Sequence, residues 1–345
     1  MLIKKLKEGY AKIRLYQPLS LVSVSLSIIL SPIKSDLLAV NEVIRASLHS
    51  GVPLVNQVAG HIIQGGGKRL RPSTLLLVGG LFGPVQKEHH ELAAVIEFIH
   101  TATLLHDDVV DQSTKRRNHK TANTIFGNAA SVLVGDFIYS RAFQMMVKIN
   151  HMKVMEVLAN TTNTIAEGEV LQLLNIHNAS IEDEEYLKVV YYKTAKLFES
   201  AAELGAIIGG AHDADIKALA QFGKHMGIAF QLIDDVLDLL GNPEEIGKNL
   251  GDDLAEGKPT LPLLYTMKKG NDQQKNIIRA AIENGGLTEL ESVLNAVKET
   301  KAIEYVRQLA KEEIEKGEKL IQHIAPSTHK DALLGLTQFV ILRDY

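Results

Sequence analysis

The sequence predicts an all-α fold, and three observations support this prediction. None of the nine prolines falls between residues 85 and 242, so long helices can run through that stretch unbroken. Its apolar residues recur at steps of three and four, as in Leu92, Val95, Ile96 and Ile99. The strict alternation that is typical of half-buried strands is missing there. We therefore expect about ten helices.

Short polar segments separate the expected helices. They span residues 112–122, 175–183 and 241–261, and no clear linker follows residue 35. Towards the end of the chain, residues 303–324 combine spaced apolar residues with many charges, which is typical of an amphipathic helix on the outside of a protein. We expect residues 36–345 to form a single domain.

Residues 1–35 differ from the rest of the chain. Several Lys and Arg residues precede an apolar, serine-containing run over residues 19–30, as in a signal peptide. The run is too short to span a bilayer, and Ser31-Pro32 follows it in place of a small-x-small cleavage site. Two interpretations remain: a targeting segment, or an extension that is poorly ordered or outside the fold.

The composition limits the classes of function. Hydrophobic residues make up 46% of the 345 residues and charged residues 23%, as in a globular protein with a large core. The net charge of −4 does not suit a nucleic-acid-binding protein. The absence of cysteine excludes disulfides, thiolate metal sites and a cysteine nucleophile, and it fits a reducing compartment such as the cytoplasm.

Two acidic motifs of the pattern Asp-Asp-x-x-Asp carry the predicted chemistry. Each follows an apolar helical run, and positions i and i+4 of a helix share one face. The outer aspartates of each motif therefore project together. A single such motif can be a solvated helix face, but two copies behind apolar helices indicate a function. The motifs comprise Asp107, Asp108 and Asp111, and Asp234, Asp235 and Asp238.

Six carboxylates at one end of a buried cleft would repel one another strongly. Mg²⁺ resolves this conflict, because it prefers oxygen ligands and is commonly held by one or two carboxylates together with substrate phosphates. The two motifs therefore predict a site for a diphosphate that is bridged to the protein by metal.

Basic residues that suit a diphosphate occur in several segments. A glycine run leads into Lys68 and Arg71, and glycines allow close approach to a phosphate. Each group has a simpler alternative: a flexible loop, a charge-balancing surface pair, or, for His100, a hydrogen-bonded core histidine. The further candidates are Arg116, Arg117, Lys193, Thr194, Lys248 and Lys258.

The sequence resembles the trans-isoprenyl diphosphate synthase family over residues 36–345. The motifs that carry the resemblance are GGGKRLRP, EFIHTATLLHDDVVD, GNAASVLVGDFIYSRAF, AEGEVLQL, KTAKLFE, FQLIDDVLD and GKNLGDDLAEGKPTLPLL. The resemblance implies an isoprenoid synthase helical bundle around a deep central cavity, with the two aspartate motifs facing each other and a homodimeric assembly.

The resemblance also implies roles for individual residues. Asp107, Asp111 and Asp234 would bind Mg²⁺, with three ions per active site, and the six aspartates together with Lys193 and Lys258 would form the catalytic set. The positions that match the site of isopentenyl diphosphate are Lys68, Arg71, His100 and Arg117. Those that match the site of the allylic diphosphate are Arg116, Lys193, Thr194, Gln231, Lys248 and Lys258.

One departure from the family pattern is visible. The family commonly has a glycine after the arginine pair, whereas here Asn118 and His119 follow it. The conformation of this loop is therefore open, although the chemistry is unaffected.

The expected activity is that of a long-chain synthase. Large aromatic residues one turn before Asp107 would block the cavity, but Ala102 is small and the side chain of Thr103 is of modest size. The candidates for the cavity floor are Met146, Met145 and Phe143. We expect an octaprenyl product made from farnesyl diphosphate and passed to membrane-associated quinone enzymes. The alternatives are a hepta-, nona- or decaprenyl product, a non-catalytic subunit of a heteromeric synthase, and a terpene cyclase or squalene-type condensing enzyme.

Overall fold

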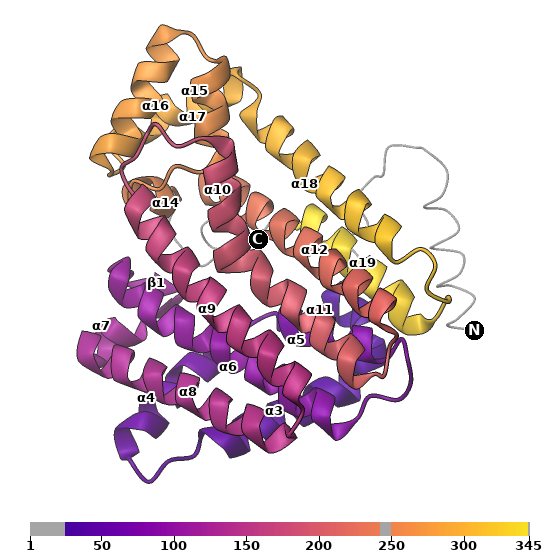
Figure 1. The fold of residues 1–345 in the computed structure, drawn as a ribbon. Helices are drawn as coiled ribbons and strands as arrows, with labels where there is room; N and C mark the ends of the chain where they lie inside the picture. Colours follow the sequence, from indigo (N-terminus) through magenta and orange to yellow (C-terminus); the bar gives the residue numbers. More distant parts are fainter. Residues whose placement is uncertain (1–24, 242–249, 344–345) are drawn as a thin grey trace.

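Helices make up nearly all of the regular structure in the computed structural model, which describes residues 25–241 and 250–343 (Figure 1). The predicted all-α class is confirmed. The first elements are α2 (Leu26–Ile29), the 3₁₀ turn η1 (Ser31–Ile33), α3 (Lys34–Leu48), α4 (Pro53–Gln64), α5 (Leu70–Gly79), α6 (Lys87–Val110), β1 (Lys115–Arg116), β2 (His119–Lys120) and α7 (Ala122–Phe126). The middle of the chain forms α8 (Asn128–Ile149), α9 (Met152–Asn175), α10 (Asp183–Val189), the π-helical turn η2 (Val190–Ala195), α11 (Lys196–Ile208) and α12 (Asp213–Leu240). The last elements are α14 (Asp252–Ala255), α15 (Leu261–Lys269), α16 (Asp272–Asn284), α17 (Leu290–Glu299), α18 (Ala302–Leu320) and α19 (Thr328–Leu342).

The described residues contain more helices than the ten or so expected from the sequence, because several are single turns such as α2 and α14. The long helices are where the proline-free stretch places them. Within that stretch, α6 has 24 residues, α9 has 24 and α12 has 28. Their length follows from the absence of helix breakers and from the apolar spacing.

Local capping chemistry sets the start of several helices. The side chain of Asn271 accepts a hydrogen bond from the backbone N–H of Gln274, whose side chain accepts one from the N–H of Asn271. This reciprocal pair satisfies two backbone donors that the first turn of α16 would otherwise leave free. Ser327 caps α19 in a similar way by accepting from Lys330 N–H at 3.1 Å.

The fold includes residues that the sequence placed in the N-terminal extension. Ile33 is fully buried, and Ile29 and Leu30 are at least nine-tenths buried within the main core. Ile29, Leu30 and Ile33 thus pack as core residues although they precede the boundary expected after residue 35, whereas Ile28 of the same segment is exposed. Residues 1–24 lie outside the described residues.

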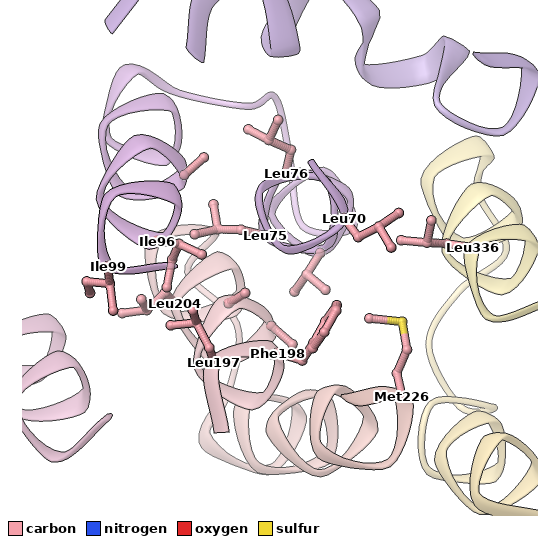
Figure 2. Packing of buried hydrophobic residues seen from close by; sticks show 14 of the residues in the cluster. Leu70, Leu75, Leu76, Ile96, Ile99, Leu197, Phe198, Leu204, Met226 and Leu336 are labelled. Atoms are coloured by element: carbon pink, nitrogen blue, oxygen red, sulfur yellow. The ribbon is translucent and has the colours of Figure 1, made fainter. Parts of the chain in front are cut away.

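The main core lies between α5, α6, α11 and α12. Figure 2 shows Leu75 of α5, Ile96 of α6 and Leu204 of α11 gathered together, with Phe198 and Met226 filling the space between α5, α11 and α12. Helix α6 is apolar on most of its circumference, as expected for a helix that is surrounded by others. It carries the first aspartate motif at its C-terminal end, so the core fixes the position of that motif.

A second hydrophobic cluster stabilises the smaller group of helices α14–α17, drawn in orange in Figure 1. It includes Leu239 at the end of α12 and Leu254 of α14. The predicted outer helix is confirmed as α18, whose apolar face buries Val306, Ala310 and Ile314 and which packs along α12. Together these contacts fix the C-terminal end of α12, where the second aspartate motif lies.

A π-helical turn interrupts the continuous helical segment formed by α10, η2 and α11. Such turns insert one extra residue into an α-helix and occur frequently at functional sites. Lys193 and Thr194 lie within this turn. None of the described helices combines the length and the apolar character needed to cross a membrane.

Candidate active site

Both aspartate motifs border a cavity of about 610 Å³. Its walls come from the C-terminal parts of α6 and α12, from α9 and η2, and from the segment that leads into α5. Asp107, Asp111, Asp234, Asp235 and Asp238 line it. The structure therefore brings together two motifs that are more than a hundred residues apart in the sequence.

The middle aspartate of the first motif does not share the direction of its neighbours. Asp108 is buried, and one of its carboxylate oxygens accepts hydrogen bonds from Arg116 Nε at 2.8 Å and Arg116 Nη2 at 2.7 Å. Asp107 and Asp111 line the cavity, while Asp108 does not. Asp108 thus holds Arg116 beside the site, and the catalytic role expected for Asp108 stays a prediction.

The middle aspartate of the second motif is also buried. Asp235 accepts hydrogen bonds from the hydroxyl of Tyr186 at 2.5 Å and from Nε2 of Gln231 at 2.8 Å. Burial raises the pKa of Asp235 to about 7, and the nearby carboxylate of Asp253 adds to this effect. Asp234, in contrast, is about two-fifths exposed and faces the cavity.

Lys193 connects the first motif to α9. Its Nζ donates to Glu169 Oε2 at 2.5 Å and Gln172 Oε1 at 2.7 Å, and lies 3.5 Å from Asp107 Oδ2. Burial lowers the pKa of Lys193, but Asp107 and Glu169 raise it by more, so the net shift is upward and the lysine is cationic. Burial in turn raises the pKa of Glu169 to about 7.

A glycine allows α9 to approach the π-helical turn closely. A Cβ at Gly168 would lie 2.8 Å from the backbone nitrogen of Lys193 and from Cβ of Tyr192, which is shorter than a normal contact. Only glycine fits there without a shift of backbone. The close packing places Glu169, the next residue, against the Lys193 side chain.

Lys258 connects the first motif to the segment between α14 and α15. Its ammonium lies 3.0 Å from Asp111 Oδ2 and 3.7 Å from Asp253 Oδ1, and it also pairs with Glu256. Burial lowers the pKa of Lys258, but Asp253 and Asp111 raise it further, so the net shift is strongly upward. Lys248, the other lysine predicted in this part of the chain, lies outside the described residues.

A second cationic group lines the cavity near the start of α5. Arg71 lies 4.5 Å from the ring centre of Phe198 and donates to Nε2 of His100 at 3.4 Å. An arginine can only donate, so this imidazole nitrogen must be an acceptor and His100 must be neutral. Burial lowers the pKa of His100 well below its usual value, and Arg71 and Arg117 lower it further.

Lys68 belongs to the same group of cations. Burial lowers its pKa to about 8, and the positive charges of Arg343 and Arg117 contribute to the shift, while Asp234 opposes it. Lys68 therefore stays mostly protonated at neutral pH. Its ammonium also lies 5.7 Å from the ring centre of Phe339 in α19.

The loop after the arginine pair is a tight hairpin. Lys115 pairs with Lys120 and Arg116 with His119, which leaves Arg117 and Asn118 as the two turn residues. Both have positive φ, of 53° and 63°, as required by a two-residue hairpin turn of type I′. Asparagine tolerates this conformation better than most residues, which explains how the chain accommodates the missing glycine.

Gly67 has a specific function in this part of the cavity. A Cβ at this position would lie 2.7 Å from Nη1 of Arg117. The side chain of Arg117 therefore occupies the space that the glycine leaves open. The sequence suggested that the glycine run serves a phosphate, and the structure shows that one of its glycines makes room for a cation that lines the cavity.

The cavity contains charged residues that the sequence did not single out. Arg343 is buried, lies 2.6 Å from Asp234 Oδ1 and donates to the backbone oxygen of Phe230 at 2.6 Å. No motif surrounds it, so only the fold reveals its position. Glu169 and Gln172 lay within the quoted segment AEGEVLQL without being named. Arg69 and Glu97, which form an ion pair, likewise lay within GGGKRLRP and EFIHTATLLHDDVVD.

Of the residues expected to set product length, one lines the cavity and others lie in the main core. Thr103 lines the cavity, and its hydroxyl donates to the backbone oxygen of His100 at 2.8 Å. Ala102 and Met146 are buried in the main core and are not among the residues that line the described cavity. Met145 is buried and Phe143 half-buried in the same core. A role in product length stays a prediction for all of them.

Known proteins resemble this chain over most of its length. Residues 52–300 match the family described as Polyprenyl synthetase. The chain is 50% identical to octaprenyl diphosphate synthase of Escherichia coli (strain K12) over 310 residues, which cover 90% of this chain and 96% of that protein. It is 48% identical over 311 residues to the octaprenyl diphosphate synthase of Haemophilus influenzae, covering 90% and 94%.

Solved structures of similar proteins also resemble this chain over most of its length. The polyprenyl synthase of Caulobacter crescentus CB15, crystallised with calcium and isoprenyl diphosphate, superposes with a TM-score of 0.90 at 38% identity and covers 93% of this chain and 98% of its own. A decaprenyl diphosphate synthase from Rhodobacter capsulatus gives 0.87 at 40% identity, covering 93% and 100%. The helical fold, the two aspartate motifs on one cavity and these similarities agree, and the chain belongs to the polyprenyl synthetase family.

Proposed function

We propose that this protein is a long-chain all-trans polyprenyl diphosphate synthase, a prenyltransferase that condenses isopentenyl diphosphate with an allylic diphosphate. One observation carries the proposal: a single cavity is lined by two aspartate motifs and by two separate groups of cations. One diphosphate needs only one such group. Two groups fit a reaction in which two diphosphates must be held at the same time.

The acidic residues fit the Mg²⁺ on which members of this family generally depend. Asp107, Asp111 and Asp234 present oxygen ligands to the cavity, and in the structure each is paired with a cation, which shows that their charges require compensation. Among the described residues, no three acidic or histidine side chains converge enough to hold a metal alone. This suits Mg²⁺ that is held partly by substrate phosphates, and we propose three ions per site.

The cations at the aspartate motifs would bind the allylic diphosphate. Lys193 and Lys258 carry positive charge beside Asp107 and Asp111, and Arg116 lines the same wall. When bound, Mg²⁺ would add positive charge against the departing diphosphate. The two lysines would offset the charge that develops on the leaving group as the allylic C–O bond ionises. Thr194, Gln231 and Lys248 are the further proposed contacts.

Lys68, Arg71, His100 and Arg117 would bind isopentenyl diphosphate. A neutral His100 between two arginines can donate a hydrogen bond from Nδ1 without adding charge. The double bond of isopentenyl diphosphate would attack the allylic cation, and loss of a proton would give the trans double bond. The released diphosphate is the proposed base. The apolar walls of the cavity would exclude water that could quench the cation.

The names of the relatives support a long product. Octaprenyl diphosphate synthases are about half identical to this chain over nine-tenths of its length. We propose octaprenyl diphosphate made from farnesyl diphosphate, for the side chain of a quinone. A product of seven, nine or ten units is the second candidate, because the Rhodobacter capsulatus relatives carry the names of nonaprenyl and decaprenyl synthases.

The cellular setting is also a proposal. We propose one synthase domain from residue 36 onward, together with the packed residues 25–35, acting in the cytoplasm as a homodimer. Large apolar side chains stay exposed on α8 and α9, among them Leu133, Val147 and Leu174, which supports an assembly of copies. The product would pass to membrane-associated quinone enzymes, and no nucleic acid is involved.

The test is product analysis. The purified protein is incubated with farnesyl diphosphate, labelled isopentenyl diphosphate and Mg²⁺, and the dephosphorylated prenols are separated by length. We expect a dominant C40 product that is lost in Asp107→Ala and kept in Asp272→Ala, an exposed aspartate of α16. A C15 or C20 product would contradict the long-chain proposal, and no elongation by the wild type would favour a non-catalytic subunit.

A further inference from the structure

A tyrosine outside every recognised motif is bound to the second aspartate motif. The hydroxyl of Tyr186, in α10, lies 2.5 Å from Oδ2 of Asp235 in α12, and both side chains are buried. Burial raises the pKa of Tyr186 well above its usual value, and the adjacent Asp235 raises it further. Tyr186 is therefore protonated at neutral pH, so the phenol donates and the carboxyl group accepts.

The same carboxyl group is the end of a chain of hydrogen bonds that starts in the π-helical turn. Thr194 Oγ1 donates to Gln231 Oε1 at 2.8 Å, and Gln231 Nε2 donates to Asp235 Oδ1 at 2.8 Å. Each oxygen of Asp235 thus has its own donor, and each donor comes from a different residue. The arrangement orients the Gln231 amide and leaves the Asp235 side chain a single position.

This position matters for the two aspartates on either side. Asp234 and Asp238 are four residues apart and line the cavity from one face of α12, whereas Asp235 is rotated about 100° from Asp234 around the helix axis. If Asp235 lost the hydroxyl of Tyr186, one oxygen of its buried carboxyl group would be left without a donor, which is unfavourable, and a change in the position of the side chain would relieve it. Because Asp235 also lines the cavity, a new position of its carboxyl group would change its repulsion with the other two and disturb their spacing.

We propose that Tyr186 is a positioning residue for the second aspartate motif, because its hydroxyl holds the buried carboxyl group of Asp235 in one position and so preserves the arrangement of Asp234 and Asp238 in the cavity. The inference rests on the proposed function, since it assigns those two aspartates to a metal-bridged diphosphate. Groups that orient metal-binding carboxylates typically change metal affinity by 10- to 100-fold when they are removed. We expect removal of the Tyr186 hydroxyl to change the joint affinity for Mg²⁺ and diphosphate in the same way.

The experiment is a double-mutant cycle read by calorimetry. Inorganic diphosphate is titrated into the wild type, Tyr186→Phe, Asp235→Asn and the double variant at fixed Mg²⁺, so no turnover is needed. We expect Tyr186→Phe to raise the Kd of diphosphate about tenfold. Because the hydroxyl acts through Asp235, the same substitution should change the Kd by less than about twofold in the Asp235→Asn background.

Tyr139→Phe is the matched control, since it removes the hydroxyl of a half-buried tyrosine of α8 that does not line the cavity. It should leave the Kd unchanged. The melting temperature of each metal-free variant is measured in parallel. A Tyr186→Phe variant that melts earlier but binds diphosphate like the wild type would overturn the proposal, as would equal effects of Tyr186→Phe in both backgrounds.

If the proposed function itself is wrong, the experiments give a different result from the one that contradicts only the role of Tyr186. In that case the wild type itself would bind no diphosphate with Mg²⁺, or would make no prenyl product in the product analysis. A wild type that binds and elongates, together with an unaltered Tyr186→Phe, contradicts only the role of the tyrosine.

Discussion

The guanidinium of Arg343 lies 2.6 Å from the carboxylate of Asp234, so the residue that follows α19 neutralises an aspartate of the second motif. The same guanidinium lies 3.8 Å from the ring centre of Phe230. Asp234 is a proposed Mg²⁺ ligand, and one carboxylate cannot serve both partners in the same way. The protein without metal therefore depends on Arg343 for a charge balance that metal would otherwise provide.

Replacing Arg343 should affect the metal-free protein most. We expect Arg343→Ala to lower the free energy of unfolding by about 1–3 kcal/mol without Mg²⁺, because it leaves a partly buried carboxylate without its main donor. Saturating Mg²⁺ and inorganic diphosphate should recover part of this loss. Urea unfolding with and without these ligands measures the effect. Arg343→Lys keeps the charge, so its free energy of unfolding should lie between those of the wild type and Arg343→Ala. An equal loss under both conditions would contradict the exchange of partners.

Gly67→Ala tests the position of Arg117. The added Cβ would meet the guanidinium at 2.7 Å and displace it from the cavity. Because small displacements of a binding group weaken binding strongly, we expect the KM of isopentenyl diphosphate to rise about tenfold. The KM of farnesyl diphosphate should stay within about twofold, since Arg117 is assigned to the other substrate. Gly60→Ala is the control, because its Cβ would meet no atom within 4 Å.

The pH dependence of stability should reveal His100. Burial depresses the pKa of His100 in the folded state, so the unfolded chain binds a proton at a higher pH than the folded one. The stability contributed by the neutral imidazole is full above the unfolded pKa near 6.5 and is lost as pH falls towards the folded pKa. At pH 5.5 the loss relative to His100→Gln should reach about 1.4 kcal/mol. Urea unfolding of the metal-free proteins at pH 7.5, 6.5 and 5.5 measures the difference, and parallel profiles would show that folding leaves the pKa of His100 unchanged.

Residue size at position 102 should control product length. Ala102 is fully buried one turn before the first motif, beside Thr103, which lines the cavity. We expect Ala102→Val to change the product little, and Ala102→Phe and Ala102→Tyr to shift it to chains of C20 or shorter. Chromatography of the prenols measures this. Since overpacking a core can destabilise it by about 1–3 kcal/mol, melting temperatures must accompany the products. An unaltered product length in a folded Ala102→Tyr variant would contradict a role of position 102 in product length.

The sequence was informative where local patterns determine structure. Proline-free, regularly spaced apolar residues predicted the long helices, and the repeated aspartate motifs predicted a shared cavity. It could not tell that Asp108 turns away from that cavity or that Asp235 is a buried residue of its wall, because their positions depend on donors from other segments, Arg116 and Tyr186. The position of Arg343 beside Asp234 could not be predicted for the same reason, since it depends on the fold and on no local sequence motif.

Two other differences have conformational causes. The hairpin turn at Arg117 and Asn118 uses positive φ at two residues, which sequence patterns predict well only when glycine is present. The early core residues Ile29 and Ile33 lie in a segment whose apolar and serine residues alternate irregularly, so its burial depends on partners elsewhere in the chain.

The π-helical turn from Val190 to Ala195 makes the length of this segment a property that the chain must keep. Deleting Val190 or Tyr191 would restore an ordinary helix and leave Lys193 and Thr194 in the chain. Because a π-helical turn takes up its extra residue locally, the flanking helices would keep nearly their present orientation, whereas the side chains of the turn itself would change direction. Lys193 would then lose its match with Glu169, and Thr194 would lose its match with Gln231. Homologous chains that keep this chemistry should tolerate substitutions in the segment far better than changes in its number of residues.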